Sequence, residues 1–429
     1  MLHRIIIVSI LVVILHAKVQ LDKISLPEGW NIDLLATIPD ARQMTINKEQ
    51  NILIVGSRYI NKVHAVVLYN KFAGTPYVLA DNLNAPNGVA FDDESGSLYV
   101  ALIDRIVKYD NIVDYVMKSQ PAPTPIVVYD KYPNHTTHGY KYIKIHNGRI
   151  FVPQGTPCDR CVNTTLPDGS ITSIKMDGSD FTVHAQGIRN SVGLDFHPIS
   201  GDLWFTDMDS THQETEHSED ELNSLRLASN VSHIPHFGYP YCYSTSHQTL
   251  PDPDFNPSKN CSAYIRPSFT LGSSVAALGC KFYSSGTNNK IPEQFKSNDL
   301  ILIAEHGSLN GTTGFKISKV NITGSEKQVF VEGWLESKTG VAWGRPVDVL
   351  VLNDGSILVS DDLAGAIYRI YHVVSTQEIK LWAYITFPIL FIVALSLIGC
   401  AIFFFNRYQS IKESQASPQG EKFEEMKDE

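Results

Sequence analysis

Short runs of alternating apolar and polar residues recur along most of this chain, separated by polar or glycine-containing turns. The clearest unit is 187–207, in which a polar Arg189-Asn190 corner precedes an alternating strand, a turn and a second apolar strand. Units of the same kind, or parts of one, lie at 44–55, 88–100, 142–152, 300–303 and 347–359. Strand-turn-strand units repeating roughly every 45 to 60 residues are typical of propeller blades. The pattern therefore predicts an all-β, six-bladed β-propeller over residues 24–374.

Polar side chains stand at equivalent corners of these units. Arg42, Asn87, His138, Arg189 and Arg345 each come just before a predicted inner strand. The loops that enter the inner strands of a propeller surround one central mouth, so we expect these side chains to converge there. The alternative is that arginine and histidine at turns only bind exposed backbone carbonyls.

The two ends of the chain carry apolar segments that predict a membrane protein. Residues 1–17 have the charged start and short apolar core of a secretory signal peptide, although an uncleaved anchor is the alternative. Residues 381–405 contain no charge over 25 positions, enough to cross a bilayer. Arg407 and Lys412 follow directly and obey the positive-inside tendency. We therefore expect a single-pass type I protein with an extracellular or lumenal propeller and a cytoplasmic tail, residues 406–429.

Sequons and cysteines agree with an extracytoplasmic propeller. Of the cysteines, Cys158 and Cys161 predict a loop-closing disulfide, the alternatives being a redox pair or half of a zinc site. Cys242 and Cys261 flank a proline-rich insertion that a second disulfide would constrain, and Cys280 is then left unpaired. Six Asn-x-Ser/Thr sequons occur, at Asn134, Asn163, Asn230, Asn260, Asn310 and Asn321.

Charge limits the classes of partner. The 429 residues carry a formal net charge of −10 at pH 7 and no basic stripe, which argues against nucleic acid as a partner. Several arginines, an imidazole and an acidic loop at one mouth favour a planar anionic ligand together with a divalent cation. The loop begins at Asp207-Met-Asp209 and continues to Glu221, and calcium is inferred from its oxygen ligands alone. For the outer part, 214–219, solvated surface is the alternative.

The chain also resembles the PQQ-dependent sugar dehydrogenases, the group that includes soluble aldose, sorbosone and fungal pyranose dehydrogenases. The resemblance extends from about Leu26 to Tyr371 and rests on the order of its motifs. These are Leu26-Pro-Glu-Gly-Trp30, Ala85-Pro-Asn-Gly-Val-Ala-Phe91, His138-Gly-Tyr-Lys-Tyr142, Pro157-Cys-Asp-Arg-Cys161, Gly187-Ile-Arg-Asn-Ser-Val-Gly193, His236-Phe-Gly-Tyr-Pro240, Ala304-Glu-His-Gly307, Trp343-Gly-Arg-Pro-Val-Asp-Val349 and Ser360-Asp-Asp-Leu-Ala-Gly-Ala-Ile-Tyr-Arg369.

The resemblance implies a six-bladed propeller that holds pyrroloquinoline quinone (PQQ) and calcium. His138 is implied as the general base for the sugar hydroxyl, since an imidazole titrates near neutral pH. Arg189 would stabilise negative charge on the quinone oxygen, Asn190 would fix the cofactor and Arg345 would pair with one of its carboxylates. We assign Arg42 and Asn87 to the cofactor as well.

The calcium ligands implied by the resemblance lie near Asp209 and Ser210, through backbone carbonyls, with Asp207 as a further candidate. Three departures from the family bear on the cofactor. Met208-Asp209 stands where relatives often have Asn-Gly, Leu309-Asn310-Gly311 replaces a stretch with tryptophan and arginine, and Val347 replaces a second arginine of the aldose dehydrogenases.

Three hypotheses about function follow. The first is a membrane-tethered quinoprotein that oxidises an aldose or pyranose and passes electrons to an external acceptor. The second is a propeller without cofactor that acts as a glycan or protein receptor, because a fold does not determine a function. The third is a hydrolase or lactonase with a central metal bound by Asn87, Asn190 and Asp207.

Overall fold

The computed structural model describes residues 19–415 apart from nine short segments. These segments are 70–71, 163–164, 211–217, 228–232, 256–259, 285–290, 309–311, 325–326 and 374–375, and the side chains of 376–387 and 413–415 are also outside the description. The chain divides into two units, Met1–His372 and Val373–Glu429.

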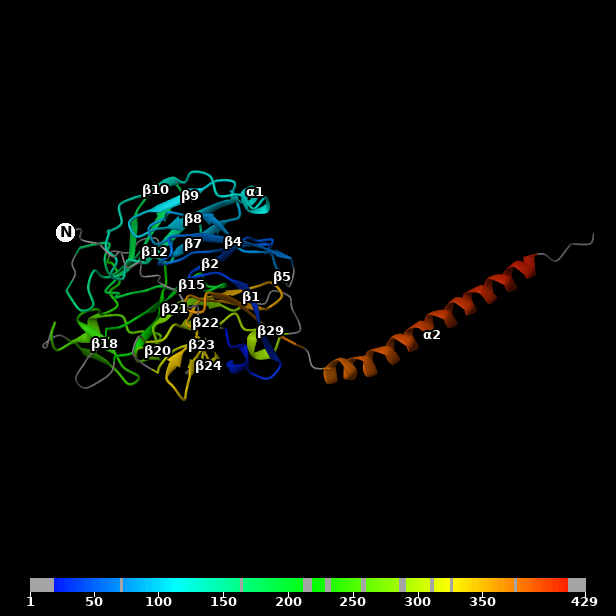
Figure 1. Ribbon diagram of the computed structural model, residues 1–429. Helices are drawn as coiled ribbons and strands as arrows, with labels where there is room; N and C mark the ends of the chain where they lie inside the picture. Colours follow the sequence, from blue (N-terminus) through cyan, green and yellow to red (C-terminus); the bar gives the residue numbers. More distant parts are fainter. Residues whose placement is uncertain are drawn as a thin grey trace, which may run out of the picture. The chain divides into compact units, whose positions relative to one another are not determined.

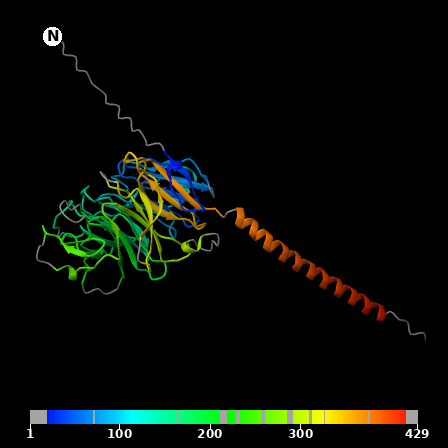
Figure 2. The same cartoon turned by 90° about the horizontal axis from the view of Figure 1, so that it is seen from below.

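The first unit consists of antiparallel sheets that form the blades of a propeller (Figures 1 and 2). Blade 1 contains β2 (Met44–Ile46), β3 (Ile52–Val55), β4 (Val63–Tyr69), β5 (Phe72–Ala73) and β6 (Tyr77–Ala80). Blade 2 contains β7 (Gly88–Asp92), β8 (Ser97–Ala101), β9 (Ile106–Tyr109) and β10 (Ile126–Tyr129). Blade 3 contains β11 (Lys144–His146), β12 (Arg149–Gln154), β13 (Ser170–Lys175) and β14 (Thr182–Gln186).

The remaining three blades follow the same order from the inner to the outer strand. Blade 4 contains β15 (Leu194–Phe196), β16 (Leu203–Asp207), β17 (Asp220–Leu225) and β20 (Phe269–Gly272). Blade 5 contains β21 (Ala277–Phe282), β22 (Leu300–Glu305), β23 (Lys316–Asn321) and β24 (Lys327–Glu332). Blade 6 contains β27 (Pro346–Val351), β28 (Ile357–Asp361), β29 (Ala366–His372) and β1 (Trp30–Thr37).

The first strand closes the ring. β1 pairs antiparallel with β29, from Trp30 opposite His372 to Thr37 opposite Ala366, so the N-terminal strand is the outer strand of the last blade. Each inner strand also contacts the inner strands of its two neighbours, and β27 contacts β2. The prediction of an all-β, six-bladed propeller is confirmed.

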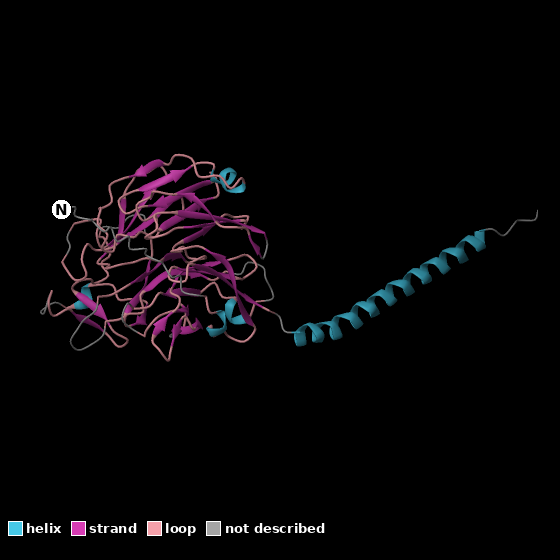
Figure 3. Ribbon diagram, viewed as in Figure 1, coloured by secondary structure: helices cyan, strands magenta, loops and turns pink. Residues whose placement is uncertain are grey.

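Helical segments within the propeller unit are short (Figure 3). They are α1 (Ile112–Met117) and the 3-10 turns η1 (Leu21–Lys23), η2 (Cys261–Ala263) and η3 (Glu293–Phe295). Two small hairpins, β18 (Cys242–Ser244) with β19 (Thr249–Pro251) and β25 (Leu335–Glu336) with β26 (Val341–Ala342), complete it.

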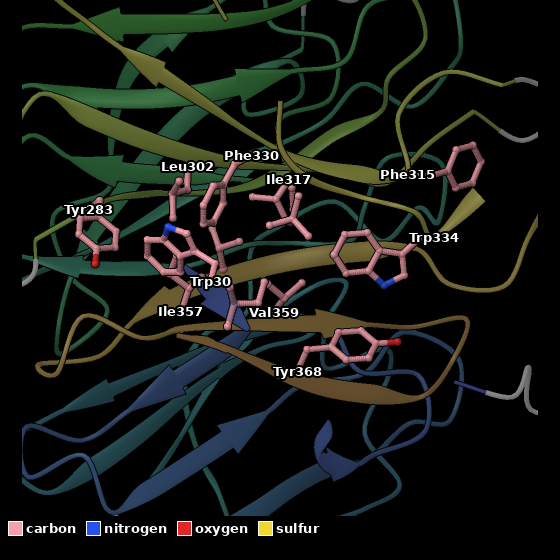
Figure 4. Close-up of a cluster of buried hydrophobic side chains, with 14 of the residues drawn as sticks. Trp30, Tyr283, Leu302, Phe315, Ile317, Phe330, Trp334, Ile357, Val359 and Tyr368 are labelled. Atoms are coloured by element: carbon pink, nitrogen blue, oxygen red, sulfur yellow. The ribbon is translucent and has the colours of Figure 1, made fainter. Parts of the chain in front are cut away.

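The hydrophobic core lies between neighbouring blades, because each alternating strand points its apolar side chains at the next sheet. The largest cluster joins blade 5 to blade 6 and includes Trp30, Leu302, Phe330 and Val359 (Figure 4). The Trp30 and Phe330 rings meet edge to face with centroids 5.1 Å apart. Replacing a buried tryptophan of this kind by alanine costs about 3–5 kcal/mol, so Trp30 stabilises the closure of the ring.

Two disulfides are present, Cys158–Cys161 and Cys242–Cys261, as predicted, and Cys280 is a buried free thiol. Of the sequons, Asn134, Asn260 and Asn321 are exposed, and Asn163, Asn230 and Asn310 lie outside the described residues.

The second unit contains α2 (Thr376–Gln415). Among the described residues it is the one helix long and apolar enough to cross a membrane, over Pro388–Lys412. This span is displaced from the expected 381–405 because side chains before Pro388 are outside the description. The whole of the predicted signal peptide (1–17) and residues 416–429 of the predicted tail (406–429) also lie outside it.

Candidate active site

The mouth of the propeller is built from two kinds of loop. One kind enters the inner strand of each blade, and the other joins the second strand to the third and returns to the same end. They surround a cavity of about 870 Å³. Of the residues predicted for the site, Arg42, His138, Arg189, Asn190, Asp209 and Arg345 line this cavity. Asn87, Asp207 and Ser210 are buried behind its wall.

His138 precedes β11 and has a left-handed backbone, with φ 51°. Its Nδ1 lies 3.1 Å from the carbonyl oxygen of Thr156. A nitrogen facing a carbonyl must carry the proton, so Nε2 of the neutral ring is the nitrogen with a free lone pair. Burial, and secondly the Arg189 guanidinium, lower the pKa of His138 to about 4. The imidazole is therefore neutral at pH 7 and able to accept a proton.

The loop that carries His138 fits closely onto Gly155. A Cβ placed on Gly155 would lie 2.5 Å from both the Cβ and the carbonyl oxygen of His138, and 3.1 Å from Oδ1 of Asn190. Only a residue without a side chain allows these two loops to approach so closely.

Arg189 and Asn190 form the corner before β15. The Arg189 guanidinium donates from Nε to the carbonyl of Asp159 over 2.9 Å, from Nη1 to the carbonyl of Met208 over 3.0 Å, and from Nη2 to the Asp159 carboxylate. The Asp207 carboxylate accepts the backbone N–H groups of Arg189 and Asn190 at 3.0 and 2.7 Å. Asp207 therefore holds this corner in place.

Arg42 and Asn87 belong to a buried network below the cavity. Arg42 is 3% exposed, and its Nε donates to Oδ1 of Asn87 over 2.8 Å. Its Nη1 donates to Asp362 over 2.8 Å, and the other oxygen of Asp362 lies 2.9 Å from Nε2 of His306. The amide of Asn87 donates to the carbonyl of Lys141 over 2.8 Å. Asn87 thus orients Arg42 and does not itself reach the cavity.

Arg345 binds the backbone of the loop that carries His306. Its Nε donates to the carbonyl of His306 over 3.1 Å and its Nη2 to the carbonyl of Gly307 over 2.5 Å. Burial would raise the pKa of Asp362, but His306 and the arginines Arg42 and Arg345 hold it well below its usual range. This side of the mouth therefore carries a fixed positive charge.

Four carboxyl groups lie close together at blade 4. Burial raises the pKa of Asp207 to about 6 and those of Asp220 and Glu221 to about 7. The pKa of Asp209 is raised well above its usual value by burial and then by Glu221. Asp207, Asp209 and Glu221 border a void of about 10 Å³. These groups share a region in which a bound cation would offset their mutual repulsion.

Ser210 follows Asp209 and is committed to bonds within its loop. Its backbone N–H donates to Oδ1 of Asp209 over 2.6 Å, and its carbonyl accepts from the Ser218 hydroxyl.

Within the described residues, no three His, Cys, Asp or Glu side chains are placed so that together they could hold a metal.

Several lining residues were not among those predicted. Arg58 and Tyr59 lie between β3 and β4, Tyr140 lies near His138, and His306 and Asp362 follow β22 and β28. Most of them come from loops between a second and a third strand of a blade. Those loops return to the mouth by the same topology that places the corner residues there, and that signal could have identified them.

Comparison with known proteins agrees with this geometry. A family model described as TrAA12-like matches residues 24–373. An uncharacterized protein of Borreliella burgdorferi is 28% identical over 370 residues, which are 81% of this chain and 91% of the relative. A calcium structure of Trichoderma reesei Carbohydrate-Active Enzymes Family AA12 superimposes with a TM-score of 0.69 at 18% identity, covering 81% of this chain and 97% of that one.

The holo form of the pyranose dehydrogenase PQQ domain from Coprinopsis cinerea superimposes with a TM-score of 0.65 at 17% identity, again covering 81% and 97% of the two chains. At these identities the structural likeness establishes the fold, and the family model extends over most of the chain. The chain therefore belongs to the TrAA12-like family, which confirms the resemblance to the PQQ-dependent sugar dehydrogenases.

Proposed function

We propose that this protein is a quinoprotein that oxidises a hydroxyl or hemiacetal carbon of an aldose or pyranose and passes the electrons to a separate acceptor. The observation that carries the proposal is a neutral imidazole, His138, with a free Nε2 in a cavity of about 870 Å³ that four arginines also line. The family supports oxidoreductase chemistry on sugars.

His138 is the proposed general base. A sugar hydroxyl within reach of Nε2 would give its proton to that nitrogen, while Nδ1 keeps its bond to the Thr156 carbonyl and holds the ring in place. Arg189 lies near enough to lower the pKa of the imidazole. Its guanidinium, which is paired with the Asp159 carboxylate in this structure, is the group that we propose stabilises an oxygen gaining negative charge in the same step. Asn190, beside it, offers an amide to the bound ligand.

The cavity suits an anionic, planar cofactor such as PQQ, whose o-quinone would accept a hydride from the sugar carbon. Arg42 and Arg345 are held by neighbouring groups with their charge at the cavity, and Asn87 supports Arg42 from behind. In the described part of the wall, Oγ of Ser308 is buried without a hydrogen-bond partner. An unsatisfied donor in a cationic wall fits a ligand with several carboxylates.

Calcium is proposed at the acidic side of this cavity. Asp209 lines it, and Asp207 and Ser210 lie directly behind. The raised pKa values of these carboxyls would fall on binding a cation, because a nearby positive charge favours the ionised form. Backbone carbonyls and water would have to complete the set of ligands.

The same proposal includes a membrane anchor. α2 contains the apolar span Pro388–Lys412, and the exposed sequons and the two disulfides favour an extracytoplasmic propeller. We propose a single-pass type I orientation on the basis of the signal-like N-terminus and the basic residues after the span.

The test is a calorimetric titration of the full chain, in detergent micelles, with PQQ at a fixed calcium concentration. Saturable binding is expected, and Arg345→Gln should weaken it about tenfold or more, as loss of one charge-assisted contact does. Arg149→Gln is the matched control, because Arg149 pairs with Asp180 outside the mouth. A folded wild type that does not bind at micromolar PQQ would contradict the proposal and favour the receptor alternative.

A further inference from the structure

Arg58 lines the cavity next to two tyrosine rings. Its guanidinium carbon is 4.0 Å from the ring centroid of Tyr140 and 4.6 Å from that of Tyr59. The two rings are 6.5 Å apart and inclined at 67°, and they come from loops of different blades. Two aromatic rings therefore lie against the guanidinium on adjacent sides and attract its charge.

The backbone under Arg58 is fixed as well. One oxygen of the Asp40 carboxylate accepts the backbone N–H groups of Arg58 at 2.7 Å and Ile60 at 3.1 Å, and that of Tyr59. Asp40 therefore binds the loop through its main chain and makes no ion pair with the Arg58 guanidinium in the described structure. The loop presents the side chain of Arg58 without neutralising it.

Arg58 differs from the other arginines of the cavity in having no acceptor. The guanidinium groups of Arg42, Arg189 and Arg345 all donate to protein oxygens. Across the described residues the Arg58 guanidinium has no hydrogen bond or ion pair, and its Nε is buried. A buried donor without a partner costs about 1–3 kcal/mol, so this site is built to receive an acceptor from a ligand.

The ligand group that fits is a carboxylate, because the planar fork of a guanidinium binds its two oxygens together. The depth of Arg58 in the cavity indicates whether this carboxylate belongs to the cofactor or to the substrate. Arg58 is half-buried and Tyr59 beside it is 67% exposed, whereas Arg42 is 3% exposed. A group that reaches Arg58 therefore belongs to the outer part of the bound ligands, which is the substrate when a cofactor lies below.

We propose that Arg58 is a specificity-determining residue that binds the carboxylate of an acidic sugar, and that the preferred substrate class is a hexuronic acid. This inference rests on the proposed sugar oxidation and names its substrate. Tyr59 and Tyr140 contact the guanidinium and line the same cavity.

The test compares wild type with Arg58→Gln and Arg58→Lys, using the full chain in detergent micelles. Calorimetry measures binding of D-galacturonate, D-galactose and PQQ separately, and of each sugar again after PQQ has been added. Thermal unfolding verifies that the variants fold, and Arg149→Gln is the arginine control. Galacturonate should bind wild type, and Arg58→Gln should weaken that binding about 10- to 100-fold, the range expected for a charge-assisted bidentate contact. Arg58→Lys should retain part of it.

Galactose and PQQ affinities should not change in the Arg58 variants. Loss of PQQ affinity with unchanged galacturonate binding would overturn the assignment to substrate and give the carboxylate to the cofactor. Equal galacturonate binding by wild type and Arg58→Gln, or none by either, would overturn the proposal altogether. If wild type binds galacturonate but not PQQ, the proposed oxidation fails while the Arg58 site stands.

Discussion

Replacement of Gly155 by alanine should disrupt the site without removing any group that touches a ligand. The added Cβ would lie 2.5 Å from the Cβ and carbonyl oxygen of His138. Ordinary carbon contacts are about 3.5–4.0 Å, so the His138 loop must move by roughly 1 Å. Overpacking of this kind costs about 1–3 kcal/mol of stability.

The same substitution should also slow catalysis. Misplacement of a catalytic group by about 1 Å lowers the rate about 10²-fold, so kcat with a sugar and a dye acceptor should fall by that order in Gly155→Ala. Binding of PQQ should weaken much less. The assays are thermal unfolding, steady-state kinetics and calorimetry on the same preparation.

A control for the substitution itself is available in blade 1. Gly74 has no close neighbour nearer than the carbonyl oxygen of Val67, which a Cβ would meet at 3.3 Å. Gly74→Ala should therefore leave kcat unchanged. Wild-type kcat in Gly155→Ala would refute the reasoning that this close approach sets the position of His138.

Two further predictions follow from charged groups. Asp195→Asn should lower the free energy of unfolding by about 3 kcal/mol, measured by denaturant titration, because it leaves Lys144 and Lys281 without the carboxylate that lies 2.9 and 3.2 Å from them. Burial alone would raise the pKa of Asp195, but these two lysines lower it to about 2. The stabilisation by this carboxylate is therefore present above about pH 4 and is lost as the pH falls towards 2. An unchanged stability would contradict the role of this group. The value of kcat/KM should stay level from pH 7 to about 5 and fall below that, because only neutral His138 accepts a proton and its pKa is lowered to about 4. A midpoint near pH 6.5 would contradict the buried, arginine-flanked environment of His138.

Much of the fold was predictable because each blade repeats a local pattern. Alternation within 88–100 or 347–359 decides both the strands and the faces that they bury. The closure by β1 was not predictable in the same way. Its pairing with β29 joins residues more than 300 positions apart in register, and only the completed ring selects that register.

The candidate site was predictable where it depends on topology. The corner residues His138 and Arg189 share a position in the repeat, and the propeller brings them to one cavity. What each side chain does there depends on contacts between blades. Asn87 turns away to bond Arg42 and the carbonyl of Lys141, and Arg58 contacts Tyr140 of another blade.

The most direct test of the central claim is the turnover of a dye acceptor by the full chain loaded with PQQ and calcium, supplied with a panel of neutral and acidic sugars. The account predicts saturable oxidation of at least one sugar. It also predicts that His138→Ala lowers kcat by about 10²- to 10⁴-fold, the usual contribution of a general base, while PQQ stays bound. A folded, PQQ-bound protein that oxidises no sugar, or a His138→Ala variant with wild-type kcat, would contradict it.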